Sequence, residues 1–187
     1  LDNNQSTLNF LEVGCGIGST SQLLNKYNIN YTGIDYSEKL IKIAKQNFQS
    51  SRINFECINV KDYNSNNLID IIFMNGALHH MTDIDLVIRK FREILKENGT
   101  IVAIEPLDNN LFFKFLRNLR KKIDKNYSSD QFFFDYKLIE KIFSKHNIQY
   151  KLIPFGFFTP PLAQIKLHLN LNIFFYKLFS FIDIFIY

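Results

Sequence analysis

The sequence predicts a doubly wound α/β domain, on three observations. Short apolar runs recur at regular intervals, and helical patterns lie between most of them. The chain has 187 residues, 47% of them hydrophobic, which is enough for one full core and too few for two ordinary domains. We therefore expect a single domain over residues 1–187, with a mostly parallel sheet covered by helices on both faces.

Each apolar run has the length and composition of a strand. The expected strands are residues 9–13, 31–34, 53–57, 70–74, 100–104 and 149–153. Apolar residues at helical spacing predict helices over residues 19–26, 37–48 and 84–97. Ser37 is expected to open the second helix, and Asn98-Gly99 to close the third before the fifth strand.

Beyond Pro106 the pattern changes, so we divide the domain into a core over residues 1–106 and an acceptor side over residues 107–187. The second part is expected to hold a basic amphipathic helix over 110–125, a helix over 134–145, the sixth strand and an aromatic tail over 162–187. Lys177 and Asp183 interrupt the tail, which therefore falls short of a membrane span.

The composition is that of a globular protein. A formal net charge of +4 is too mild to indicate nucleic-acid binding by itself. Cys15 and Cys57 are far apart and form no C-x-x-C pair, so we expect no disulfide and no metal site. A reduced, cytoplasmic location follows as the expectation.

The most informative segment is LEVGCGIGS, residues 11–19, which lies between the first strand and the first helix. Gly14, Gly16 and Gly18 allow a sharp turn and let backbone N–H groups approach a ligand, and the helix N-terminus that follows favours polar, partly anionic groups. A small charged ligand is therefore expected here. The alternative is a tight turn without a ligand.

Asp35 ends the second strand, which should neighbour the first in this kind of sheet. A carboxylate at this point can accept hydrogen bonds from two adjacent ribose hydroxyls. The alternative is that Asp35 only caps the helix that begins near Ser37.

Together, E-x-G-x-G-x-G and the acid after the second strand resemble motifs I and II of class I S-adenosylmethionine-dependent methyltransferases, whose fold is Rossmann-like. Residues 53–63, 68–83 and 93–106 resemble the family's later segments, and the resemblance runs from about residue 8 to residue 154. It implies a methyltransferase with S-adenosylmethionine as cofactor.

The resemblance also implies roles for individual residues. Glu12 would serve the methionine amino group, directly or through water, and Asp35 would hold the ribose. Asn59 and Val60 take the adenine-contacting positions, although Asp62 is an alternative contact. The cofactor-binding set is Glu12, Gly14, Cys15, Gly16, Gly18, Asp35, Tyr36, Asn59, Val60 and Asn75, where Tyr36 either stacks on adenine or belongs to the core.

The acceptor is less closely defined. Asn75-Gly76 is not the N-P-P-Y motif of enzymes that methylate nucleic-acid bases or protein glutamine, which favours a small-molecule or lipid-like acceptor over nucleic acid. His80 is the candidate catalytic base, needed only if the acceptor must lose a proton. In the alternative, one of His79 and His80 caps the helix near Asp83 and the other is packed.

Two other functions compete with methyl transfer. A nicotinamide-dependent oxidoreductase would also use Asp35, but its fingerprint is G-x-G-x-x-G, and Glu12 would repel a pyrophosphate. A cofactor-binding scaffold without turnover is the other alternative.

Residues 110–125 place apolar side chains at helical spacing beside a basic complement, as in a helix at a lipid interface. Peripheral membrane contact is thus one expectation, and packing of this helix on the sheet is the other. We also expect the chain to be truncated at both ends, without the family's N-terminal segment and seventh strand.

Overall fold

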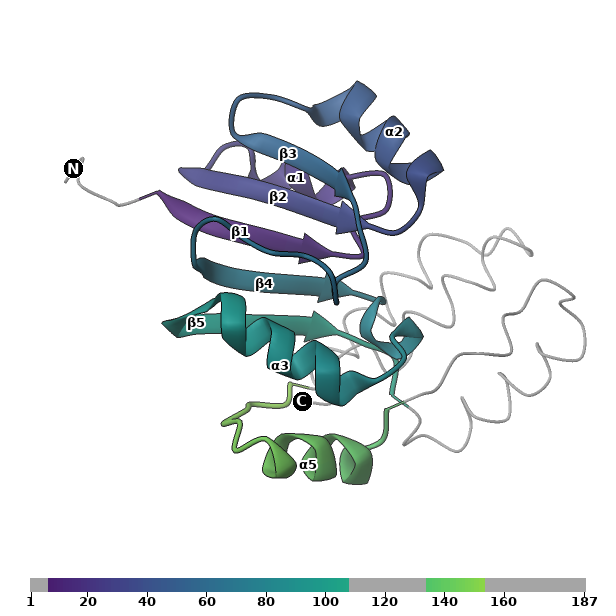
Figure 1. The fold of residues 1–187 in the computed structure, drawn as a ribbon, viewed down its shortest axis with the longest axis vertical. Helices are drawn as coiled ribbons and strands as arrows, with labels where there is room; N and C mark the ends of the chain where they lie inside the picture. The colour runs from purple at the N-terminus through teal and green to yellow at the C-terminus, as the bar shows by residue number, and fades with distance from the viewer. Residues whose placement is uncertain (1–6, 108–133, 154–187) are drawn as a thin grey trace, which may run out of the picture. The chain divides into compact units, whose positions relative to one another are not determined.

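The structure is a computed structural model, which describes residues 7–107 and 134–153. Its centre is a five-stranded parallel sheet in the order β3-β2-β1-β4-β5. The strands are β1 (Leu8–Val13), β2 (Ile29–Asp35), β3 (Ile53–Cys57), β4 (Ile69–Asn75) and β5 (Leu95–Ile104). All five arrowheads lie at one edge of the sheet in Figure 1. The predicted doubly wound parallel sheet is confirmed.

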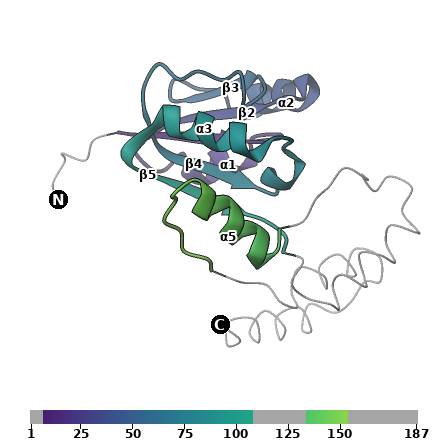
Figure 2. The same cartoon turned by 60° about the horizontal axis from the view of Figure 1, so that its bottom comes forward.

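Helices follow β1, β2 and β4, whereas residues 58–68 lead from β3 to β4 without a helix. The helices are α1 (Ser19–Leu24), α2 (Glu38–Phe48), the short 3-10 helix η1 (Leu78–His80) and α3 (Ile84–Ile94), and α5 (Tyr136–Lys145) follows later in the chain. In Figures 1 and 2, α3 lies on one side of the sheet and α1 on the other. Because the order reverses at β1, the carboxyl ends of β1, β2 and β4 meet where a doubly wound sheet binds its ligands.

The sheet has a core on each face, because successive side chains of a strand point to opposite sides. The core on the α3 side includes Leu11, Val13, Ile34, Ile72, Met74, Val87 and Phe91. The core on the α1 and α2 side includes Phe10, Tyr31, Ile41, Ala44, Ile53 and Phe55. The near-continuous apolar strands of the sequence are thus explained by burial on both faces.

The ends of α1 and α2 follow local chemistry. The prediction that Ser37 opens the second helix is confirmed, since its hydroxyl accepts a bond from the Leu40 N–H at the start of α2. The first helix ends at Leu24, two residues earlier than expected, where the Tyr27 N–H bonds to the Leu24 carbonyl.

The expected closure of the third helix at Asn98-Gly99 is wrong. Helix α3 ends at Ile94, and Leu95 already pairs with Ile69 as part of β5. The pairing then shifts, with Thr100 opposite Ile71, so Asn98 and Gly99 form an irregularity inside the strand. A Cβ on Gly99 would lie 2.7 Å from the Leu95 side chain, which explains why glycine occupies this bend.

The expected sixth strand over residues 149–153 is also wrong, because the chain there has no strand conformation. Asn147 has a positive φ of 50°, and the Ile148 N–H turns back to the Phe143 carbonyl at the end of α5. Tyr150 then packs on the Phe143 ring, with 4.8 Å between centroids. These local contacts replace strand pairing.

The fourth predicted helix begins at Tyr136, two residues later than expected, because the Asp135 side chain caps it by accepting from the Leu138 N–H. Phe134 is buried and forms an isolated bridge with Leu107. The expected helix over 110–125 and the aromatic tail over 162–187 lie outside the described residues.

Candidate functional site

The loop between β1 and α1 has the conformation that its three glycines predict. Gly14, Gly16 and Gly18 have φ angles of +74°, +54° and +81°, which L side chains rarely adopt. A Cβ on Gly14 would lie 2.6 Å from the Ala77 Cβ, and one on Gly18 would lie 2.7 Å from the Phe55 ring. A Cβ on Gly16 would meet nothing within 4 Å. The backbone at Gly16 is therefore open to a ligand, while its two neighbours are packed.

Asp35 lies directly beside this loop. Its Oδ2 accepts a bond from the Gly16 N–H at 3.0 Å, and its Oδ1 accepts one from the Ser37 N–H at 2.9 Å. Asp35 thus organises both the glycine loop and the start of α2, which includes the capping role considered from the sequence. Each carboxylate oxygen can accept a further bond, so the ribose role remains compatible with these contacts.

Glu12 is buried at the end of β1, with 3% of its surface exposed. Its Oε1 accepts from the Thr20 hydroxyl at 2.7 Å, and its Oε2 accepts from the Tyr31 hydroxyl. Burial, which outweighs these two bonds, raises the pKa of Glu12. Glu12 therefore joins β1 to α1 and β2, and its service to a methionine amino group stays a prediction.

Cys15 and Tyr36 differ in environment. The Cys15 side chain is buried in the core on the α1 and α2 side, and this burial raises the pKa of its thiol, which stays protonated. Only its backbone is suited to a ligand. Tyr36 is 81% exposed at the carboxyl end of β2, which contradicts the core alternative and leaves its ring free to stack.

The segment after β3 separates the proposed adenine contacts. Val60 is buried in the core on the α3 side, so its side chain is structural. Asn59 is exposed, with Oδ1 accepting from the Lys61 N–H at 3.0 Å, and Asp62 is also exposed. Both remain available as polar contacts, and the choice between them stays open.

Asn75, the last residue of β4, is exposed, and the two histidines that follow have different surroundings. His79 is buried, and its Nδ1 lies 2.6 Å from Glu105 Oε2. His80 is exposed, and burial of part of its ring, followed by the adjacent His79, lowers its pKa. The idea that a histidine caps the next helix is wrong, because the Asp83 side chain accepts from the Leu86 N–H. The packed alternative holds for His79.

Glu105 is a residue that sequence reasoning missed. It follows β5 directly, and its Oε1 accepts from the Ala77 and Leu78 N–H groups at 3.1 and 2.7 Å. The only sequence signal was an acid between the fifth strand and Pro106. Its partners could not be foreseen, because they are far away in the chain.

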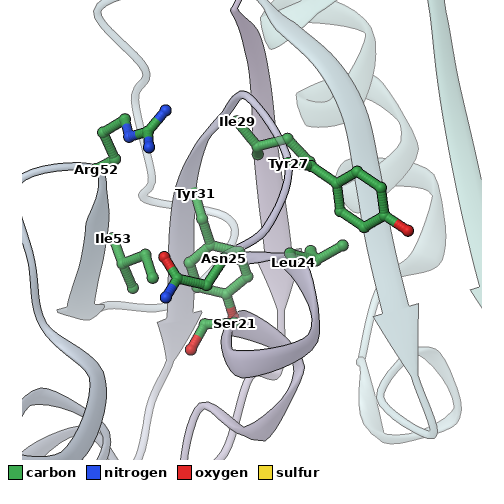
Figure 3. A pocket seen from close by; sticks show the side chains of 8 residues that line it. All are labelled: Ser21, Leu24, Asn25, Tyr27, Ile29, Tyr31, Arg52 and Ile53. Carbon is green, nitrogen blue, oxygen red and sulfur yellow. The ribbon is translucent and has the colours of Figure 1, made fainter.

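A small pocket lies elsewhere, at the amino ends of β2 and β3. Figure 3 shows its lining from the end of α1 and from the two strands, with residues Ser21, Leu24, Asn25, Tyr27, Ile29, Tyr31, Arg52 and Ile53. Ligands of parallel sheets bind at the carboxyl ends, so this pocket is not the candidate site.

The described ranges of the chain are residues 7–107 and 134–153. They contain no group of three or more histidine, cysteine or acidic residues that could hold a metal ion. They also contain no helix that is long and apolar enough to cross a membrane.

A sheet ordered β3-β2-β1-β4-β5, with a glycine loop after β1 and an acid at the end of β2, defines a Rossmann-like nucleoside-binding protein. Residues 11–101 match the family model of the methyltransferase domain. This segment, slightly less than half of the chain, is similar to methyltransferase domains that use S-adenosylmethionine.

Its relatives include a malonyl-[acyl-carrier protein] O-methyltransferase of Acetivibrio thermocellus, 29% identical over 74% of this chain and 51% of the relative. A ubiquinone biosynthesis O-methyltransferase of Bradyrhizobium diazoefficiens is 27% identical over 55% of this chain and 41% of the relative. The chain thus spans about half the length of the curated relatives it matches.

Among solved structures, phosphoethanolamine N-methyltransferase 2 of Haemonchus contortus in complex with S-adenosyl-L-methionine shares the fold. Its TM-score is 0.61 at 18% identity, covering 89% of this chain and 38% of that one.

Proposed function

We propose that this protein transfers a methyl group from S-adenosylmethionine to a small-molecule acceptor. The observation that carries the proposal is the bond between the Gly16 N–H and Asp35 Oδ2, at a point where the loop backbone is open. This bond joins the two features that a nucleoside cofactor needs, a backbone that the ligand can approach closely and a carboxylate that accepts from its hydroxyls. The residues present at this edge of the sheet therefore fit the cofactor.

In this proposal Asp35 holds the ribose hydroxyls and the backbone of residues 14–18 lies along the methionine part. Glu12, held by the Thr20 and Tyr31 hydroxyls, serves the methionine amino group directly or through water. Tyr36 and either Asn59 or Asp62 are the adenine contacts, and Asn75 lies at the same edge. Bound S-adenosylmethionine supplies a methyl group that is already activated. The residues of the protein then have to align the acceptor with that methyl group and exclude water.

The two O-methyltransferase relatives support a small acceptor with an oxygen nucleophile. Such an acceptor loses a proton on methylation unless it is already ionised, which gives His80 a task as general base. Its lowered pKa keeps the imidazole neutral at neutral pH, as a base must be. The family match favours methyl transfer over hydride transfer as the activity to assay.

Calorimetry with S-adenosylmethionine tests the site through Asp35→Ala. Loss of two hydrogen bonds to a charged acceptor, at about 1 to 2 kcal/mol each, predicts roughly a 30- to 1000-fold loss of affinity. The matched control is Asp70→Ala, which also removes an aspartate that accepts a backbone bond, from the Asn9 N–H at 2.8 Å. Asp70 opens β4 at the opposite edge of the sheet, so its removal should spare affinity.

Unchanged affinity in folded Asp35→Ala would refute the site assignment. A folded wild-type protein that binds no S-adenosylmethionine would refute the function itself. Mass spectrometry of cell extract incubated with the labelled cofactor then identifies the methylated product and decides between an active enzyme and a scaffold without turnover.

We further propose a cytoplasmic location with peripheral contact at a membrane surface, which suits a lipid-like acceptor. The support is the sequence of residues 110–125, where Lys114, Arg117, Arg120, Lys121 and Lys122 accompany an apolar stripe. Binding to anionic vesicles is the property that tests this proposal.

A further inference from the structure

One carboxylate holds three consecutive residues of the loop after β4. Glu105 Oε1 accepts from the Ala77 and Leu78 N–H groups at 3.1 and 2.7 Å, and Oε2 lies 2.6 Å from His79 Nδ1. The Glu105 side chain is only 7% exposed. A buried carboxylate with both oxygens engaged fixes the backbone around it, because any movement of the loop leaves the charge unpaired.

One of these residues, Ala77, contacts the glycine loop. A Cβ on Gly14 would lie 2.6 Å from the Ala77 Cβ, so Ala77 packs directly on the α-carbon of Gly14. The position of Ala77, whose N–H is held by Glu105, therefore limits where Gly14 can lie. Glu105 thus affects the position of the glycine loop through Ala77.

The candidate base is linked to this arrangement as well. The His80 N–H donates to the Ala77 carbonyl at 3.1 Å, and the rings of His79 and His80 lie 4.1 Å apart. Because His79 is held by Glu105 and His80 is exposed beside it, the orientation of the His80 ring depends on the buried pair.

We propose that Glu105 is a positioning residue of this methyltransferase, which holds residues 77–79 so that Ala77 supports the glycine loop and His80 faces the acceptor. This inference rests on the proposed function. It assigns a role to the end of β5, which otherwise contributes no side chain to the site. Glu105 acts through Ala77 and His79 and needs no contact with cofactor or acceptor.

Amide hydrogen exchange tests the loop contacts independently of activity. The amides of Ala77 and Leu78 should be protected in the wild-type protein, and Glu105→Ala should expose them and raise their exchange rates about tenfold or more. Glu97→Ala is the matched control, because it removes an exposed carboxylate from β5, the strand that Glu105 follows, and should leave both rates unchanged.

Glu105→Gln distinguishes the two sets of contacts that the carboxylate makes, with the backbone and with His79. The amide oxygen can replace Oε1 and keep both backbone bonds, while the amide NH₂ replaces Oε2 opposite His79. Protection of Ala77 and Leu78 should therefore persist. Affinity for S-adenosylmethionine should fall roughly tenfold in Glu105→Ala and be largely restored in Glu105→Gln, whereas kcat should fall in both because His79 loses its charged partner.

The following results would overturn the proposal. Glu105→Ala that folds, with wild-type exchange at residues 77 and 78 and wild-type cofactor affinity, overturns the proposal. If Glu105→Ala does not fold, two other results still overturn the proposal. One is a wild-type protein whose Ala77 and Leu78 amides are unprotected, and the other is loss of their protection in Glu105→Gln. A wild type that fails to bind S-adenosylmethionine refutes the proposed function, while the exchange rates still decide whether Glu105 holds the loop.

Discussion

At the scale of single residues, the site depends on buried carboxylates whose partners come from other elements. Glu12 accepts hydroxyl bonds from α1 and β2, Asp35 accepts backbone bonds from the loop and α2, and Glu105 accepts bonds from the segment after β4. The sequence singled out the first two acids by their motif positions. All three serve as acceptors that order the protein around the proposed cofactor site, a role no motif states.

Tyr31→Phe should lower the free energy of unfolding by about 1 to 3 kcal/mol, because it leaves a buried Glu12 oxygen without its hydroxyl donor. Urea denaturation measures the change. Tyr63→Phe is the comparison, since Tyr63 is a buried tyrosine in the other core whose hydroxyl bonds to Ser65 and Thr32 and to no carboxylate, so its loss should be smaller. Restoration of stability in the double variant Tyr31→Phe with Glu12→Gln would assign the loss to the carboxylate, and an unaltered single variant would contradict the role of the bond.

If His80 is the base, His80→Ala should lower kcat and leave cofactor affinity unchanged. The folded-state pKa of His80 lies below its ordinary 6.5, so the imidazole protonates only below that pH, and wild-type kcat should fall as pH falls. This acidic limb should vanish in the variant's pH profile. The depressed pKa also means that the contribution of His80 to stability is present above pH 6.5 and is lost as pH falls through the folded pKa. A profile identical to the wild type would exclude the role.

At the scale of elements, the glycine loop divides into packed and open positions. Gly14 and Gly18 face Ala77 and Phe55, whereas Gly16 faces open space. The motif alone treats the three glycines alike. Tertiary packing therefore separates the two glycines that the fold requires from the one whose backbone is open at the proposed cofactor site.

Substitution with alanine should separate these two roles. Gly14→Ala should unfold the protein or lower its melting temperature sharply, because it adds a Cβ at 2.6 Å from Ala77 to an unfavourable φ. Gly16→Ala should cost only about 1 to 2 kcal/mol of backbone strain, and should weaken S-adenosylmethionine binding by narrowing the open backbone. Thermal melts and calorimetry measure both. Equal stability losses in the two variants would contradict the division.

At the scale of the whole molecule, the proposals give two parts of the chain different tasks. The sheet would bind the cofactor, and the basic residues 110–125 would contact a membrane surface. The formal charge of +4 is modest, but residues 114–125 concentrate basic side chains in one stretch. A concentrated stretch acts on anionic surfaces more strongly than the same charge spread evenly.

The full chain should co-sediment with vesicles of phosphatidylcholine and phosphatidylserine, and less so as salt screens the charges. Reversal of Lys121 and Lys122 to Glu should release it. Reversal of Lys42 and Lys45, exposed on α2, is the matched control for the same change in net charge and should have no effect. A folded chain that stays in the supernatant at low salt would refute the membrane proposal.

The sequence was enough to predict the parallel sheet, its five described strands and the glycine loop with Asp35, because these rest on short-range patterns of apolar residues and glycines. It failed where long-range pairing decided the conformation. Asn98-Gly99 has the composition of a helix end, yet pairing of Leu95 with Ile69 draws it into β5. Residues 149–153 have the composition of a strand, yet Tyr150 packs on Phe143 instead.

Long-range packing sorts the candidate residues into those that lie in the core and those that lie at the surface. Val60 and Asn59 are neighbours in the chain, but the first is buried and the second exposed. His79 and His80 are likewise equivalent in sequence, and Glu105, some 25 residues away, buries one and leaves the other at the surface. Burial and partners at such separations depend on how strands are placed side by side, which no local pattern encodes.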